Sequence, residues 1–321
     1  MKSNILVCSA GRRVDLVRSF SKSLKDYIHD GKVFCTDMNP ELSAACYISD
    51  GFFKSPRVTD IGYIDFLLEE CIENEIGLVI PTIDTELILF SENKDLFKEH
   101  DITLLISDAE LISLCRDKRE TTKLFGELNI DRPIIYDKDH LRFPCFCKPY
   151  DGSCSIGAIA VNESSELTKD LLSNPKNIFM ELIPKSYCEY TIDAYYTNNG
   201  ILKCLVPRKR LEVRGGEVSK GVTRKNFVYD YLLKRVSTLK GAMGCITFQL
   251  FVNEDNKLIK GLEINPRFGG GYPLSHDSGA RFTDWLVQEY FCNRRIEFFD
   301  NWEDNLTMLR YDAKVLVHDN K

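Results

Sequence analysis

The sequence lacks the features of several large protein classes. No uncharged apolar run in its 321 residues approaches the roughly 20 residues that a membrane-spanning helix needs. The short apolar run after Lys2 is too brief for the hydrophobic region of a secretory signal, and Gly11-Arg12-Arg13 follows it at once. No internal repeat or low-complexity segment is visible. These absences argue against a membrane-embedded protein or a repeat array, and we expect a cytoplasmic protein.

The pattern of a disulfide framework or a zinc site is also missing. The twelve cysteines are scattered and form no C-x-x-C pair, so we expect reduced thiols. Cys145 and Cys147 alternate along an apolar segment and therefore point to one face of a strand, where they either share a metal or pack in a core. The lack of a neighbouring histidine or second cysteine pair favours the core.

An excess of positive charge is absent too. The formal net charge is −6, and a mildly acidic protein lacks the broad positive field that attracts nucleic-acid backbones or anionic lipid. Hydrophobic residues make up 44% and charged residues 28% of the chain, which is ordinary globular composition. We therefore expect no nucleic-acid and no membrane partner. The length predicts two or three packed lobes.

The first third of the chain alternates apolar segments with amphipathic ones. Strands are expected at NILVCSA, KVFCTD, LVIPT and TLLIS, with helices near Val14 to Tyr27 and Ile64 to Asn74. This alternation predicts a parallel sheet covered by helices. No G-x-G-x-x-G follows the first strand, and no G-x-x-x-x-G-K-[ST] occurs anywhere in the chain. Dinucleotide-binding and P-loop sites therefore lack sequence support.

Polar or small residues follow each of these strands, at the edge where parallel sheets bind ligands. They are Ser9 to Gly11, Asp37, Thr82 to Glu86 and Ser107. Our hypothesis is that Asp37, Asp84 or Glu86 holds a polar group of a substrate. Asp84 and Glu86 have a competing explanation, because a carboxylate at the start of a helix also caps it.

The rest of the chain predicts a linking helix and two further lobes. The helix runs from about Asp108 to Leu128 and ends before Pro133. A small α+β lobe follows, with strands FPCFCK, AIAV and IFMELI and a helix near Ser165 to Ser173. The last lobe has strands YTIDAYY, ILKCLVP, CITFQLFVN and KLIKGLEIN and a helix from about Phe282 to Phe291. We place the domain boundaries at 1–110, 111–184 and 185–321.

Oxygen donors gather in the last two strands. Alternation places Glu263 and Asn265 on one face and Leu262 and Ile264 on the other. Gln249, on the preceding strand, joins Glu263 only if the hairpin loop is odd or bulged, because a strict two-residue loop pairs it with Leu262. Three oxygen donors that include one carboxylate are typical of Mg²⁺ that is completed by phosphate and water.

Two cationic residues suit the handling of phosphate. Arg267 follows Pro266, whose fixed φ aims the next side chain, and a guanidinium beside metal ions stabilises a transferring phosphoryl group. The alternative is a solvated arginine at a strand end. Lys148 ends a strand just before the loop Asp151 to Gly157, where glycines let backbone N–H groups approach phosphate.

Taken in order along the chain, these motifs resemble the ATP-grasp superfamily, most closely the group of the carbamoyl phosphate synthetase large subunit and biotin carboxylase. Asp117-Lys118 and Phe146-Cys147-Lys148-Pro149 are similar to its two ATP-phosphate lysines, and Asp151 to Gly157 resembles its phosphate-covering loop. Met180 to Ile183 resembles the hinge that meets adenine. Glu189 is similar to the ribose-binding carboxylate, Gln249, Glu263 and Asn265 to the metal ligands, and Arg267 to the active-site arginine.

The resemblance implies a fold of class α/β and α+β, with an N-terminal parallel β/α domain, Rossmann-like and of the pre-ATP-grasp type, before a two-lobed ATP-grasp fold. It implies ATP and Mg²⁺ or Mn²⁺ as cofactors. The implied activity is that of an ADP-forming ligase, which activates a carboxylate as an acyl phosphate and joins it to an amine or similar nucleophile. The implied ATP-binding residues are Lys118, Lys148, Ser153, Gly157, Glu181, Leu182, Ile183 and Glu189.

Two other functions share these ATP contacts. One is a bicarbonate-using carboxylase or carbamoyl-phosphate-type kinase, and the other is a nucleotide-binding regulatory protein. The chain holds one ATP-grasp unit and no biotin-attachment segment, which disfavours the complete carbamoyl phosphate synthetase or biotin carboxylase activity. The joint presence of Glu263, Asn265 and Arg267 favours turnover over regulation. The expected partners are a small-molecule carboxylate and a nucleophile. The sequence leaves the oligomeric state open, with a homodimer as one alternative.

Two further features each have two interpretations. Segment 207–225 is rich in cations and glycines, and we interpret it as a mobile loop that either closes on phosphate or an acidic substrate or is merely solvated. His276 lies just beyond the glycine run Gly269 to Gly271, where it is either a general base or a hydrogen-bonded loop residue.

Overall fold

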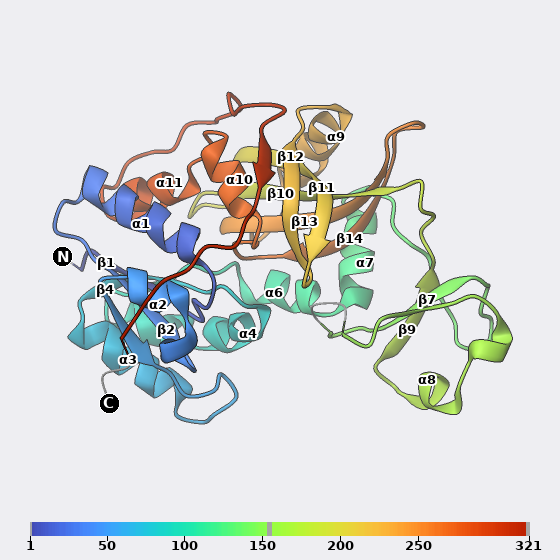
Figure 1. Cartoon of the computed structure of the whole chain (residues 1–321), viewed down its shortest axis with the longest axis horizontal. Helices are drawn as coiled ribbons and strands as arrows, with labels where there is room; N and C mark the ends of the chain where they lie inside the picture. Colours follow the sequence, from blue (N-terminus) through green and yellow to red (C-terminus); the bar gives the residue numbers. More distant parts are fainter. Residues whose placement is uncertain (1, 153–155, 319–321) are drawn as a thin grey trace.

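Three sheets organise the chain in the computed structural model, which describes residues 2–152 and 156–318 (Figure 1). The N-terminal sheet has five parallel strands in the order β3-β2-β1-β4-β5. Its elements are β1 (Asn4–Val7), α1 (Val14–Tyr27), β2 (Val33–Asp37), η1 (Pro40–Leu42), α2 (Ala44–Ile48), β3 (Gly51–Lys54), α3 (Tyr63–Glu73), β4 (Ile76–Ile80), α4 (Asp84–Glu92), α5 (Lys94–Lys98) and β5 (Thr103–Leu104).

Parallel pairing follows from the near-continuous apolar strands, which are buried on both faces of this sheet. Ile5 and Val7 point to one core and Leu6 and Cys8 to the other. The strand order changes direction between β1 and β4, and the residues that follow these two strands lie beside each other at this switch point. Thr82 confirms the proximity, since its Oγ1 donates to the carbonyl oxygen of Cys8 at 2.9 Å.

The small lobe is a four-stranded sheet in the order β6-β9-β7-β8 and lies at the right of Figure 1. Cys145 and Cys147 are fully buried in its core, as the interpretation as core residues predicted. Its elements are β6 (Ile135–Tyr136), β7 (Cys145–Pro149), β8 (Ile159–Val161), η2 (Ser164–Glu166), α8 (Lys169–Ser173) and β9 (Asn177–Glu181).

The C-terminal lobe is a six-stranded antiparallel sheet in the order β14-β13-β10-β11-β12-β15. Its hydrophobic core is continuous with one face of the N-terminal domain, where Phe20 of α1 meets Phe268 edge to face at 5.9 Å. Its elements are β10 (Cys188–Tyr196), β11 (Leu202–Arg214), β12 (Glu217–Thr223), α9 (Phe227–Val236), β13 (Gly244–Asn253), β14 (Leu258–Asn265), α10 (Tyr272–Asp277), α11 (Phe282–Tyr290) and β15 (Thr307–Leu309).

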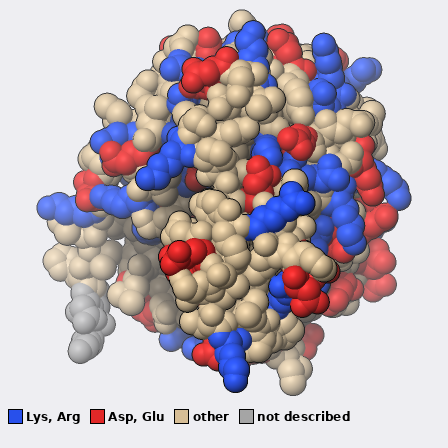
Figure 2. Space-filling model, turned by 90° about the vertical axis from the view of Figure 1, so that its right-hand side faces the viewer, with Lys and Arg blue, Asp and Glu red and all other residues tan. Residues whose placement is uncertain are grey.

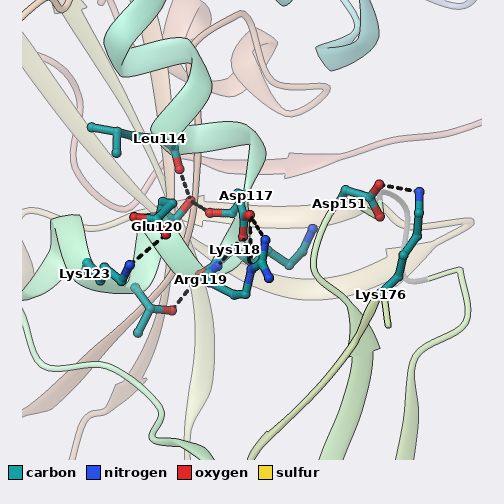
Figure 3. A network of polar contacts seen from close by, with 10 residues as sticks. Leu114, Asp117, Lys118, Arg119, Glu120, Lys123, Asp151 and Lys176 are labelled. Carbon is teal, nitrogen blue, oxygen red and sulfur yellow. Dashed lines mark hydrogen bonds and ion pairs between the residues drawn. The ribbon is translucent and has the colours of Figure 1, made fainter. Parts of the chain in front are cut away.

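The single linking helix that the sequence predicted is wrong. Two helices, α6 (Ala109–Arg116) and α7 (Lys118–Glu127), meet at Asp117, whose backbone is extended with φ −98° and ψ 114°. The Asp117 side chain accepts a hydrogen bond from the backbone N–H of Arg119, so it caps α7. The break places Lys118 at the first position of α7 (Figure 3).

The interpretation of segment 207–225 as a mobile loop is also wrong. This segment forms most of the β11–β12 hairpin, in which Arg214 pairs with Glu217 across Gly215-Gly216. Both glycines have positive φ, +58° and +80°, as a type I′ hairpin turn requires. The cations therefore occupy fixed positions on a sheet.

The prediction of a parallel β/α domain followed by two strand-rich lobes is confirmed. Within residues 2–152 and 156–318, the structure has no helix with the length and apolar character needed to cross a bilayer. Figure 2 shows acidic and basic side chains interspersed over the face that it presents.

Candidate active site

A cavity of about 760 Å³ lies where the three sheets meet, and it is lined from all of them. Ten of the predicted site residues line it, which are Lys118, Lys148, Glu181, Leu182, Ile183, Glu189, Gln249, Glu263, Asn265 and Arg267. Gly157 does not line it, although Gly152 and Ile156 of the same segment do. Ser153 lies outside the described residues. The structure thus brings together residues that are up to 149 positions apart in the sequence, from Lys118 to Arg267.

The candidate metal ligands lie together on β13 and β14. The register shifts between Gln249 and Leu250, so that Gln249 pairs directly with Glu263, while Thr247 pairs with Asn265. This bulge is the condition that the sequence set for Gln249 and Glu263 to share a face. It leaves Leu262 without a partner on β13 and turns it toward the cavity rather than the core.

The donor set suits a hard cation. Gln249, Glu263 and Asn265 offer two amide oxygens and one carboxylate, which Mg²⁺ or Mn²⁺ accepts together with phosphate oxygens. The amide nitrogen of Asn265 is buried without a hydrogen-bond partner, which marks this side chain as prepared for a further contact. Over the described residues, no group of three or more His, Cys, Asp and Glu side chains is arranged to hold a metal.

Two lysines face these ligands from other elements. Lys118 Nζ lies 3.8 Å from Glu263 Oε1 and donates to the carbonyl oxygen of Gly152. Lys148, at the end of β7, is only 7% exposed. Its burial lowers the pKa of Lys148 to about 8, with Glu263 opposing that shift and Lys118 adding to it. A cation that is poorly solvated and has few partners is ready to bind an anion. We call Lys118, Lys148, Gln249, Glu263 and Asn265 the lysine wall.

Figure 3 shows how the approach to the lysine wall is held. Asp117 and Arg119 form an ion pair at 2.5 Å at the start of α7, and Arg119 stacks on the ring of Tyr150 at 3.9 Å. Across from it, Lys176 donates to Asp151 at 2.6 Å. These contacts hold the start of α7 and the backbone near Asp151, from which Lys118 and Gly152 come, in place.

The expected adenine and ribose residues already have ion-pair partners. Lys260 donates to both carboxylate oxygens of Glu181, at 2.8 and 2.6 Å. Arg210 donates to Glu189 at 2.7 Å. Each carboxylate still borders the cavity and keeps free acceptor positions. Lys260 and Arg210 therefore orient Glu181 and Glu189 rather than block them.

A second set of residues also lines the cavity; the sequence proposed Thr82 to Glu86 and the cationic segment 207–225 among them as substrate contacts, and it did not identify Arg13. They come from the switch point of the parallel sheet, from β11 and from the glycine run. We call this set the arginine wall, and it consists of Arg13, Thr82, Asp84, Arg208 and Gly269 to Gly271. The sequence signal for Arg208 was its alternation with Val206 and Arg210 before a Gly-Gly turn, which is typical of a hairpin. Arg13 had no such signal.

Arg267 joins the two walls. Its guanidinium donates to Asp84 Oδ2 at 2.9 Å, and its Nε is buried without a partner. Asp84 is the first residue of α4 and makes no capping hydrogen bond there, so the helix-start explanation for Asp84 is limited to its negative charge in the first turn. Its carboxylate instead orients Arg267, across 183 positions of sequence.

The structure does not support the other two carboxylates of the substrate hypothesis. Asp37 accepts from the backbone N–H of Gly11 at 2.9 Å and lies outside the cavity lining. Glu86 is fully buried and accepts from Ser9 at 2.5 Å and Tyr63 at 3.1 Å. Burial raises the pKa of Glu86 to about 7, against the effect of these hydrogen bonds. Both residues hold the N-terminal domain together.

His276 also lies outside the cavity lining. It is on α10, with its Nδ1 3.4 Å from the hydroxyl of Tyr272. Burial lowers the pKa of His276, with Asp277 and Asp284 opposing and Arg281 and Lys22 adding to the shift. This position fits the interpretation as a hydrogen-bonded residue and gives no access to the cavity.

Comparison with known proteins agrees with this architecture. Residues 5–105 match the family of PylC-like N-terminal domains, and residues 173–308 match a family described as ATP-grasp in the biosynthetic pathway with the Ter operon. A search of curated proteins finds no significant match.

Solved structures with the same fold have low sequence identity. The biotin carboxylase domain of Hydrogenobacter thermophilus 2-oxoglutarate carboxylase has a TM-score of 0.74 at 13% identity, over 95% of this chain and 73% of that one. The N5-carboxyaminoimidazole ribonucleotide synthetase PurK gives 0.71 at 13%, over 93% and 79%. The L-amino acid ligase of Bacillus licheniformis gives 0.67 at 15%, over 90% and 74%. This chain thus joins a segment that matches PylC-like N-terminal domains to a segment that matches an ATP-grasp family, and it has the fold of biotin carboxylase and PurK.

Proposed function

We propose that this protein is an ATP- and Mg²⁺-dependent ligase that activates a carboxylate as an acyl phosphate and joins it to an amine or a similar nucleophile. The observation that carries the proposal is the lysine wall. There, Glu263 pairs directly with Gln249 on the sheet while Lys118 approaches the same carboxylate from α7. Cation ligands and phosphate-binding lysines thus meet in one cavity that also holds Arg267.

Each wall has its own part in the reaction. Lys118 and Lys148 bind the phosphate oxygens of ATP, and Gln249, Glu263 and Asn265 hold Mg²⁺, which neutralises charge that builds up on the transferring phosphoryl group. Arg267, held by Asp84, binds the reacting carboxylate at the junction of the walls. Its position is fixed before substrate arrives, so little reorganisation is needed.

The proposed reaction has two steps. A carboxylate oxygen of the acid attacks the γ-phosphorus of ATP, and the bond to ADP breaks. The amine nitrogen then attacks the acyl carbon and phosphate leaves with its electron pair, while the amine loses a proton. Phosphate therefore carries one oxygen that came from the acid. Lys118 also donates to the carbonyl oxygen of Gly152, which holds this backbone beside the phosphate-binding lysines.

The test is a screen of ADP release against pools of amino acids and sugar acids, with hydroxylamine as the nucleophile. Hydroxylamine traps an acyl phosphate as a hydroxamate. ADP release that depends on one acid, with a hydroxamate of that acid, is the expected result. Acid-independent ADP release, or acid-dependent release without a hydroxamate from any acid, would contradict the proposal.

A bicarbonate-using reaction is the second candidate. The Hydrogenobacter structure, whose fold this chain shares, was solved with MgADP and bicarbonate. ADP release that depends on bicarbonate and on no other acid would assign this function instead.

The assembly is a separate proposal. The Hydrogenobacter domain is a dimer, and we propose a homodimer for this protein, which size-exclusion chromatography with light scattering tests. A cytoplasmic location stays our expectation.

A further inference from the structure

The glycine run is packed against charged side chains. A Cβ added at Gly270 would lie 2.8 Å from the carboxylate of Glu217 and 2.9 Å from Nη1 of Arg13, and one added at Gly271 would overlap Nη1 of Arg208. These distances are too short for a real side chain. Arg13 and Arg208 therefore lie directly on the backbone of the loop that follows Arg267, and glycine at positions 270 and 271 leaves room for them.

The arginines of this region differ in their carboxylate partners. Arg208, 1% exposed, pairs with the fully buried Asp193 at 2.8 Å, and Arg310 pairs with Glu217 at 3.5 Å. Two of the Arg208 nitrogens, Nε and Nη2, are buried without a geometrically good hydrogen bond. Arg267 pairs with Asp84. These three charges are thus balanced within the protein.

Arg13 is the exception. Its one hydrogen bond to the described part of the chain runs from Nη2 to the carbonyl oxygen of Thr82, at 3.4 Å, and no described carboxylate lies within 4.0 Å of it. Desolvation lowers the pKa of Arg13 to about 10, with Arg267 and Arg310 adding to the shift and Glu217 and Asp84 opposing it, so Arg13 is protonated at neutral pH. The arginine wall therefore presents one cation that forms no ion pair with a described residue, with the carboxylates of Glu217 and Asp84 acting on it only from a greater distance.

We propose that the arginine wall binds a second anionic group of the acid substrate, a carboxylate or a phosphate, and that Arg13 is the residue that selects for it. The proposal deepens the proposed function and rests on it, since Arg267 binds the reacting carboxylate. The substrate is then a small acid with two anionic groups, one at Arg267 and one at Arg13. A planar guanidinium binds either anion through two parallel hydrogen bonds.

The experiment measures binding by calorimetry in the presence of Mg²⁺ and a non-hydrolysable ATP analogue. Succinate is compared with butyrate, and glutarate with valerate, because each pair has the same chain length and differs in one carboxylate. We expect the wild type to prefer the diacid of at least one pair by about tenfold or more. Arg13→Gln should reduce that preference to about threefold or less, and Arg13→Lys should keep part of it. The same assay with 3-phosphonopropionate shows whether phosphate or carboxylate is the preferred second anion.

Two controls separate a binding role from a structural one. Arg18→Gln changes an exposed arginine one turn further along α1 and should leave the preference intact. Affinity for the ATP analogue and the thermal midpoint should stay near wild type in Arg13→Gln. A wild type without any diacid preference, or an Arg13→Gln protein that keeps it, would overturn the proposal. Because this assay needs no phosphoryl transfer, failure of the proposed ligase reaction would appear separately, as an absence of acid-dependent ADP release.

Discussion

The lysine wall and the arginine wall bound the same cavity but are built differently. The cation ligands of the lysine wall are neighbours within one sheet, such as Gln249 and Glu263, which pair directly on β13 and β14, and its lysines come from α7 and β7. The arginine wall depends on residues from separate domains, and its link to the reaction is the ion pair between Asp84 and Arg267, 183 positions apart. In the proposed function, the residues that handle ATP come from short sequence motifs. The residues proposed to select the substrate meet only through contacts between domains.

The two walls also differ in how their charges are held. Lys148 is buried with few partners, which leaves it ready for an anion, whereas Arg208 is anchored by Asp193. Asp193 accepts further hydrogen bonds from Ser275 at 2.7 Å and Thr247 at 3.1 Å. This buried network fixes the arginine wall in place before substrate binds.

The largest effect is expected in the lysine wall, at Glu263. Glu263→Gln keeps the shape but removes the only carboxylate of the cation site, so ATP turnover should fall by about 1000-fold or more. The measurement is ADP release together with the thermal midpoint, which should change little. Glu254→Gln is the control, since Glu254 is on the same hairpin and lies outside the cavity lining. Normal turnover in Glu263→Gln would contradict the metal assignment.

Lys148 gives the next largest effect. Lys148→Ala removes a phosphate partner in both the ground and the transition state, so affinity for ATP should weaken by about 10- to 100-fold. Calorimetric titration with an ATP analogue measures it. Lys169→Ala, on the exposed face of α8 in the same lobe, should bind normally. Equal affinities for the two variants would show that Lys148 does not contact phosphate.

Asp84 tests the ion pair with Arg267, the residue that lies between the two walls. Asp84→Ala frees Arg267 to change its position, so kcat/KM for the acid should fall by about 10- to 100-fold while ATP affinity stays near normal. Asp84→Asn, which can still accept a hydrogen bond, should recover part of the loss. A lowered thermal midpoint with unchanged acid kinetics would show that the ion pair serves stability alone.

The smallest effect on turnover is expected at Glu86, which belongs to neither wall. Its pKa is raised to about 7 from an ordinary 4.5, so the folded state keeps a proton that the unfolded state releases. The free energy of unfolding should therefore fall as the pH rises from about 4.5 to 7, by roughly 3 kcal/mol from this residue. Glu86→Gln should remove that dependence, as measured by denaturant unfolding at pH 5 and pH 8. Glu92→Gln, exposed on the same helix, should keep it.

Particular residues show what could be predicted from the sequence. Lys148, Glu263 and Asn265 were predicted because strand alternation and short motifs place them without knowledge of distant contacts. Arg13 was missed because its role depends on a glycine run more than 250 positions away. The break at Asp117 was missed because apolar residues recur at helical spacing on both sides of it, although an Asp at this place is a capping signal. Sequence patterns thus predicted the strands and motifs. Which charged side chains have an ion-pair partner depends on tertiary contacts, which the sequence patterns do not contain.

The most direct test of the ligase mechanism follows a single oxygen atom. The acid that stimulates ADP release is labelled with ¹⁸O in its carboxylate, and the phosphate produced with an amine present is analysed by ³¹P NMR. The mechanism predicts phosphate that carries one ¹⁸O from the acid, because the acyl–oxygen bond breaks when the amine attacks. Phosphate without label would contradict the account, since it would mean that the γ-phosphoryl group passed to water and never to the carboxylate.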